Sequence, residues 1–137
     1  MNITILGAGA WGTALAISLA SKNQVLLWGR NQSAMQAAQE QRENRRSLAG
    51  FSFPNNLQAT SDFAAAMRHS GEDGLLIIAS SVAGLRPILT QCKGYSTQNV
   101  VWLCKGFEET TNLLPHQVVQ QVLGDGVNAG ALSGPSF

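Results

Sequence analysis

Charged side chains are scarce in this chain. Its 137 residues include nine basic and eight acidic ones, 12% in total, and the net charge is +1. Soluble domains usually carry about twice that charged fraction, roughly a quarter of their residues. Because there is no basic excess to attract phosphates, we expect neither a nucleic-acid partner nor a membrane partner. A surface this poor in charge also suggests that another part of a protein covers some of it.

Cysteine is nearly absent as well. Cys92 and Cys104 are the two cysteines, which is too few for a disulfide framework, and they do not have the spacing of a zinc site. We therefore expect no metal and a reducing compartment, the cytoplasm. A chain of this length is expected to form one domain with an ordinary core.

Residues 3–20 form a long apolar stretch that resembles a signal peptide or a membrane span. A signal peptide has positive charge before its apolar run, whereas the first basic residue here is Lys22, after it. Glycines also interrupt the stretch too often for a spanning helix. We interpret it as a strand followed by a helix.

Strand signals and helix signals alternate along the whole chain. The strands are apolar runs, which is typical of parallel strands covered on both faces, and helices of about ten residues separate most of them. This alternation predicts an α/β fold with a doubly wound, mostly parallel sheet, a Rossmann-type dinucleotide-binding domain. The expected strands are 2–7, 24–28, 74–79, 99–104 and 128–132; the expected helices are 11–21, 33–41, 61 or 62 to about 69, 83–91 and 113–123, and 43–56 is expected to be a loop.

A Gly-x-Gly-x-x-Gly run lies between the first strand and the first helix. Gly7 is expected to turn the chain tightly out of the strand, and Gly9 to let a pyrophosphate approach the backbone. Gly12 is expected to let the helix pack against the sheet, with its N-terminal amides facing the phosphates. The run therefore predicts a dinucleotide site.

Cofactor choice depends on the end of the second strand. NAD-binding domains commonly have an Asp or Glu there, which binds the ribose hydroxyls. No acidic residue occurs before Glu40, and Arg30 occupies the strand end instead. Arg30 either binds a 2′-phosphate, which favours NADP over NAD, or is simply solvated. Arg42, Arg45 and Arg46 either extend these phosphate contacts or are solvated loop residues.

Polar residues also follow the later strands, where the binding crevice of such a sheet lies. Ser80 and Ser81 either supply hydroxyls near the cofactor or only turn the chain. Lys105 directly follows a strand and precedes Gly106, so its ammonium group is expected to enter the crevice as a phosphate or hydroxyl partner. Residues 133–136 follow the last strand.

Four segments together resemble bacterial NAD(P)-dependent glycerol-3-phosphate dehydrogenase: residues 7–16 (GAGAWGTALA), 28–30 (WGR), 105–108 (KGFE) and 132–137 (LSGPSF). The resemblance implies hydride transfer between NAD(P)H and dihydroxyacetone phosphate, which gives sn-glycerol 3-phosphate for phospholipid synthesis. It leaves a homodimer possible in the full-length protein. It implies that Lys105 contacts both cofactor and substrate, and it assigns the other positions as follows: cofactor contacts at Gly7, Gly9, Ala10, Trp11, Gly12 and Arg30, and substrate contacts at Gly134 and Ser136.

The chain departs from the family pattern at two places. Family members commonly have an aromatic-Leu-Pro sequence where this chain has residues 47–49 (SLA), and Cys104 occupies a position where Ser or Thr is frequent. The first departure puts a cofactor contact at Ser47 in doubt. The position of Cys104 in a strand favours a small buried hydrophobic side chain over a reactive thiol.

The resemblance also implies a second, all-helical domain that carries the lysine used for proton transfer. We therefore expect residues 1–137 to be the dinucleotide-binding domain alone, without a catalytic residue and without turnover. Two alternatives stay open from sequence. One is a related dehydrogenase acting on 2-ketopantoate, a 3-hydroxy acid or 6-phosphogluconate, and the other is a non-catalytic dinucleotide-binding module.

Overall fold

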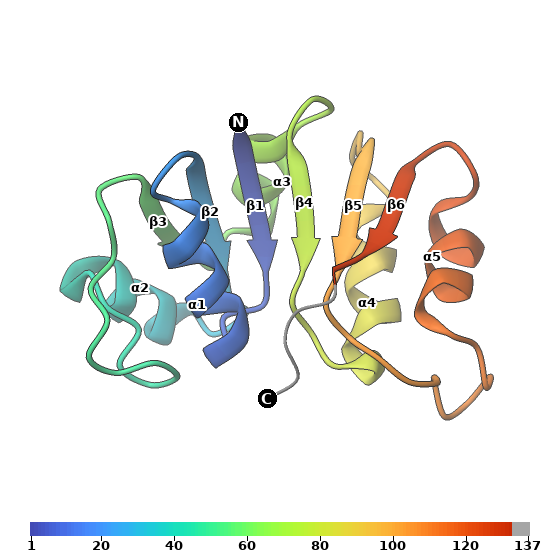
Figure 1. Cartoon of the computed structure of the whole chain (residues 1–137), viewed down its shortest axis with the longest axis horizontal. Helices are drawn as coiled ribbons and strands as arrows, with labels where there is room; N and C mark the ends of the chain where they lie inside the picture. The colour runs from blue at the N-terminus through green and yellow to red at the C-terminus, as the bar shows by residue number, and fades with distance from the viewer. Residues whose placement is uncertain (133–137) are drawn as a thin grey trace.

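The structure, a computed structural model, describes residues 1–132. A six-stranded sheet forms its centre, with strand order β3-β2-β1-β4-β5-β6, and all five pairings are parallel (Figure 1). This confirms the predicted doubly wound fold. The strands are β1 (Asn2–Leu6), β2 (Gln24–Trp28), β3 (Leu57–Thr60), β4 (Leu75–Ile78), β5 (Asn99–Trp102) and β6 (Asn128–Ala131). The helices are α1 (Ala10–Leu19), α2 (Gln32–Gln41), α3 (Phe63–Ser70), α4 (Val82–Cys92) and α5 (Pro115–Leu123).

Helices cover both faces of the sheet and create two separate apolar cores. On one face, α1 and α2 pack against the sheet through small side chains, including Ala16 and Ala38, around the fully buried Ile5. On the other face, α3, α4 and α5 contribute Met67, Leu85 and Val118, among others, to the second core. Two buried faces explain why the central strands are apolar without alternation.

The order of strands places a crevice between β1 and β4. The chain leaves β1 to build one half of the sheet with β2 and β3, then returns to β4 on the other side of β1. The carboxyl ends of all strands lie at one edge of the sheet, where the arrowheads point in Figure 1. In such sheets ligands bind at this edge, next to the point where the strand order reverses.

The structure contains one strand that the sequence did not predict. Strand β3 was not expected, because Leu57–Thr60 is short, follows Pro54 and is half polar; it forms an edge strand that pairs with β2 alone. Strand β6 is largely exposed within residues 1–132; the expectation that another part of a protein covers some of this surface stays a prediction. The other elements occur where the sequence predicts them, with ends that differ by one or two residues.

Within residues 1–132, no helix is long and apolar enough to cross a membrane. The same residues contain no group of three or more His, Cys, Asp or Glu side chains that could hold a metal ion.

Candidate functional site

Two of the three glycines after β1 are required by the fold itself. Gly7 has φ +127°, a conformation that side chains rarely tolerate, and a Cβ atom there would lie 2.2 Å from the carbonyl oxygen of Ala79. A Cβ atom on Gly12 would lie 2.2 Å from the carbonyl oxygen of Gly7. These glycines let β1, α1 and the end of β4 pack closely. They do not by themselves indicate a ligand.

Gly9 is different, because the fold gives no reason for a glycine there. Its φ of −75° and ψ of −174° suit any residue, and a Cβ atom would meet no other atom within 4 Å. Gly9 is also the N-cap of α1, and no side chain caps that helix or places an acid in its first turn. The space above Gly9 and the uncapped amides of α1 together fit a phosphate group that approaches the backbone closely.

A groove runs along the sheet edge from this glycine turn. Its volume is about 590 Å³, and it extends from Gly7 past Arg30 to Ser81 and one side of α4. Its lining is mostly apolar with a few polar groups, as is common in small-molecule sites. The remaining lining residues are Ala8, Trp28, Gly29, Ala79, Ser80, Ala83, Gly84, Pro87, Ile88 and Gln91.

The serines after β4 have local roles in the backbone. The Ser81 hydroxyl accepts a hydrogen bond from the Gly84 backbone N–H (3.2 Å) and caps α4, while the Ser80 hydroxyl donates to the Ser81 carbonyl (2.9 Å). Of the two alternatives, these bonds support chain turning. Both residues nevertheless line the groove.

Arg30 lies at the carboxyl end of β2, as its position in the sequence predicts. Its side chain is exposed, and within residues 1–132 it makes no hydrogen bond or ion pair. It lines the groove and also a second, smaller hollow of about 260 Å³. The other lining residues of this second hollow are Ala8, Gly29, Asn31, Ala34, Met35, Asn44, Arg46 and Ser47.

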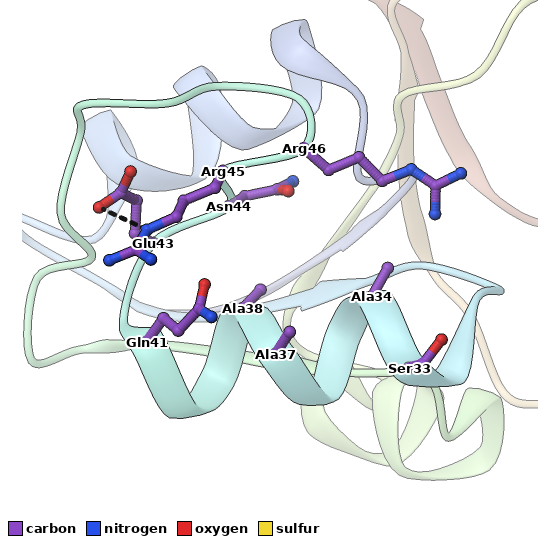
Figure 2. A pocket seen from close by; sticks show the side chains of 9 residues that line it. All are labelled: Ser33, Ala34, Ala37, Ala38, Gln41, Glu43, Asn44, Arg45 and Arg46. Atoms are coloured by element: carbon purple, nitrogen blue, oxygen red, sulfur yellow. Dashed lines mark ion pairs between the residues drawn. The ribbon is translucent and has the colours of Figure 1, made fainter.

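The three arginines of the following loop have different surroundings. Arg42 ends α2 with φ +55° and donates hydrogen bonds to the carbonyl oxygens of Pro54 (2.9 Å) and Leu57 (2.6 Å), so its role is structural. Arg45 pairs with Glu43 at 3.6 Å. Arg46 extends away from that pair (Figure 2). Only Arg46 joins Arg30 in the smaller hollow.

Sequence reasoning missed Asn44, which connects this loop to the glycine turn. Its side chain is buried, and its Nδ2 donates to the Ala8 carbonyl (3.0 Å) and to the Thr13 hydroxyl (2.9 Å). An asparagine in a polar loop carries no pattern that would indicate such a contact. The contact forms because Thr13, a buried residue of α1, faces the loop that carries Asn44.

Lys105 lies just beyond β5 at the same edge of the sheet. Its side chain is exposed, and the chain turns at Gly106, which has φ +97°. Parallel strands are spaced by about 4.8 Å, and β4 alone separates β5 from β1. Lys105 thus follows β5 at the edge of the sheet that holds the crevice, although it lines neither the groove nor the smaller hollow.

An ion pair fixes the segment that follows Lys105. The Arg86 guanidinium donates two hydrogen bonds of 2.9 Å to the buried Glu108 carboxylate, and Thr111 donates a third. These bonds tie the loop after β5 to α4. The hydrogen bonds from Arg86 and then Thr111 lower the pKa of Glu108.

Acid should therefore destabilise this fold through Glu108. A lowered folded-state pKa means that the stabilisation is complete above the unfolded pKa, about 4.3 for Glu, and is lost as pH falls through the folded value. We expect the melting temperature to fall on acidification less steeply in Glu108→Gln than in the unsubstituted chain. Thermal unfolding at a series of pH values measures this, with Glu109→Gln as the control; equal slopes for all three proteins would contradict it.

Four other positions named in the sequence analysis complete the comparison. Trp11 lies in the first turn of α1 and is 38% exposed, beside the glycine turn. Burial raises the pKa of the Cys104 thiol, as expected for a packed rather than a reactive side chain. Gly134 and Ser136 lie outside the described residues.

Comparison with known proteins shows extensive similarity. Residues 2–137 match the family described as NAD-dependent glycerol-3-phosphate dehydrogenase N-terminus. Glycerol-3-phosphate dehydrogenases [NAD(P)+] of Janthinobacterium sp. (strain Marseille) and Herminiimonas arsenicoxydans are 64% and 61% identical over 137 residues. The crystal structure of glycerol-3-phosphate dehydrogenase from Coxiella burnetii is 33% identical over 98% of this chain and 41% of its own, with a TM-score of 0.87. The chain spans 41% of the length of both curated relatives.

Proposed function

This chain belongs to the family of NAD-dependent glycerol-3-phosphate dehydrogenase N-terminal domains, and on that premise we propose that it binds NAD(P) across the carboxyl edge of its sheet. The observation that carries the proposal is the open space above Gly9 beside the uncapped N-terminus of α1. Gly7, Ala10, Trp11 and Gly12 surround it. The pyrophosphate lies there, and the adenosine half follows the groove past Arg30.

NADP is the favoured cofactor. At the end of β2 a carboxylate would repel a 2′-phosphate, whereas Arg30 offers several N–H donors to it. Arg30 is exposed and makes no ion pair or hydrogen bond within the described part of the chain, so its guanidinium is available. Its presence does not exclude NAD, since a guanidinium can also stack on adenine.

The substrate is proposed from the relatives, which are named for acting on glycerol 3-phosphate. Lys105 supplies a cation for the phosphate or hydroxyl of dihydroxyacetone phosphate, and the loop held by Arg86 and Glu108 positions it. Gly134 and Ser136 are the further substrate contacts that we propose. The nicotinamide supplies the hydride when it is bound; the protein binds and orients the reactants.

We further propose that the proton donor belongs to the part of the family protein that this chain does not span. The exposed apolar strand β6 is consistent with a face that other protein covers. On this proposal the protein acts in the cytoplasm and contributes to phospholipid synthesis.

The proposal predicts binding without turnover for residues 1–137 alone. We expect NADPH to bind weakly, because only part of the site is present, and dihydroxyacetone phosphate to cause no NADPH oxidation. Fluorescence titration measures NADPH binding, and an absorbance assay measures NADPH oxidation. A full-length family member with this domain serves as the positive control for turnover. Sustained turnover by the 137-residue chain would contradict the proposal that the proton donor lies outside it. Failure to bind either dinucleotide would contradict the proposed function itself.

A further inference from the structure

The smaller hollow beside Arg30 contains a second cation that the sequence alone did not distinguish from its neighbours. Arg45 and Arg46 are adjacent and both exposed. Both line a hollow of about 390 Å³ beside α2, which Glu43 also lines, yet their side chains extend in different directions. Arg45 turns to the Glu43 carboxylate, and Arg46 extends in the other direction (Figure 2). Within residues 1–132 Arg46 makes no hydrogen bond or ion pair, so its charge is not neutralised there by a protein carboxylate.

A buried contact fixes the place of Arg46. Asn44, two residues earlier, is 3% exposed and hydrogen-bonds to the Ala8 carbonyl and to Thr13. This holds the start of the loop against the turn that carries Gly7 and Gly9. Arg46 is therefore presented beside the ends of β1 and β2, although the sequence separates it from Arg30 by a whole helix.

The composition of the hollow fits an anion with several oxygens. Besides Asn44, whose side-chain amide already donates to Ala8 and Thr13, its polar lining residues are Arg30, Arg46, Asn31 and Ser47, and no lining residue has a carboxylate. Guanidinium groups bind phosphate through paired N–H donors. A hollow lined by chance with solvated side chains would not be expected to have two unpaired cations and no acidic residue in its lining.

The position of the hollow indicates which phosphate of a dinucleotide it would bind, the pyrophosphate or a 2′-phosphate. The glycine turn receives the pyrophosphate, and the end of β2 is where the adenosine ribose presents its 2′ position. The hollow adjoins the groove at Ala8, Gly29 and Arg30, and then extends away toward α2 and Arg46. The hollow therefore adjoins the expected position of the ribose 2′ oxygen, on the side toward Arg46.

We propose that Arg46 is a specificity-determining residue that binds, together with Arg30, the 2′-phosphate of an adenine dinucleotide. Asn44 acts as a positioning residue, because it places Arg46 without touching the ligand. This inference rests on the proposed function, since it needs a dinucleotide at the sheet edge. It assigns to Arg46 a role that Arg42 and Arg45 do not share.

The test compares Arg46→Gln with Arg45→Gln in the full chain. The two substitutions remove one charge each from adjacent exposed positions, so a general effect of net charge would be equal in both. Dissociation constants are measured by calorimetry for four probes: NADPH, NADH, adenosine 2′,5′-bisphosphate and 5′-AMP. The two adenosine probes lack the nicotinamide half and report on the adenosine site alone.

We expect Arg46→Gln to weaken NADPH and the bisphosphate roughly tenfold, as for loss of a charge-assisted contact. NADH and 5′-AMP should change less than about twofold, as should all four probes with Arg45→Gln. Equal effects of the two substitutions, or equal losses for phosphorylated and unphosphorylated probes, would overturn the assignment to Arg46. If the unsubstituted chain bound NADH and NADPH equally well, the inference would fail while the proposed function stood. If it bound neither, the proposed function would fail.

Discussion

Substitution of Gly9 by alanine is expected to weaken dinucleotide binding about 100-fold while the chain keeps its fold. An added methyl group would occupy the space where the pyrophosphate approaches the backbone, and would meet no protein atom within 4 Å. Displaced phosphates lose one or two charge-assisted hydrogen bonds to the α1 amides, each contributing about 1.5–3 kcal/mol. NADPH and NADH share the pyrophosphate, so both should lose affinity equally.

The free energy of unfolding should change little in Gly9→Ala. Its backbone angles suit alanine, and the weaker N-cap costs less than about 1 kcal/mol. Fluorescence titration gives the affinity and thermal unfolding gives the stability.

Gly12→Ala is the matched control, since its Cβ atom would collide with the Gly7 carbonyl oxygen at 2.2 Å. We expect it to destabilise the fold by about 3 kcal/mol or more. If Gly9→Ala bound dinucleotides normally, or unfolded as Gly12→Ala should, the phosphate role of this turn would be wrong.

Substitution of Arg30 by alanine is expected to change cofactor preference. The guanidinium would lose its bonds to the 2′-phosphate, a contact that NADH does not have. We expect the dissociation constant of NADPH to rise roughly 10- to 100-fold, equivalent to about 1.4–2.8 kcal/mol, and that of NADH to rise less than about threefold through lost stacking on adenine. Direct titration with each nucleotide measures both.

Arg68→Ala is a suitable control for this substitution. Arg68 is an exposed arginine of α3 that lies with Met1 and Gly74 around a hollow distinct from the groove and from the smaller hollow, and its removal changes the net charge equally. It should leave both affinities unchanged. Equal losses of NADPH and NADH in Arg30→Ala would refute a 2′-phosphate role.

The fold was predictable because its signals are local and repeated. Apolar runs, alternating helices and the glycine run each pointed to the same sheet, and the sheet has the predicted architecture. Strand β3 escaped prediction because Leu57–Thr60 is half polar and forms at the sheet edge. Its pairing with β2, not its own sequence, makes it a strand.

The site was only partly predictable, since its further members are brought together by the tertiary structure. The position of Arg30 follows from the end of a strand. No pattern in the sequence, however, separates Arg46 from Arg42, which binds backbone carbonyl oxygens, or from Arg45, which pairs with Glu43. The role of Asn44 in positioning the loop depends on its hydrogen bonds to Ala8 and Thr13, which only the tertiary structure brings close to it.

The central claim is that a dinucleotide lies across the carboxyl edge of the sheet with its adenosine end beside Arg30. NMR on the isotope-labelled chain tests this most directly, because it identifies the residues whose amides respond to bound NADP⁺. Backbone amide signals are recorded as NADP⁺ is added. The account predicts chemical-shift changes centred on Gly9–Gly12, on Gly29–Asn31 and on Asn44–Ser47, with little change near Arg68 and Gly74. No change at the glycine turn, or changes confined to a different edge of the sheet, would contradict it.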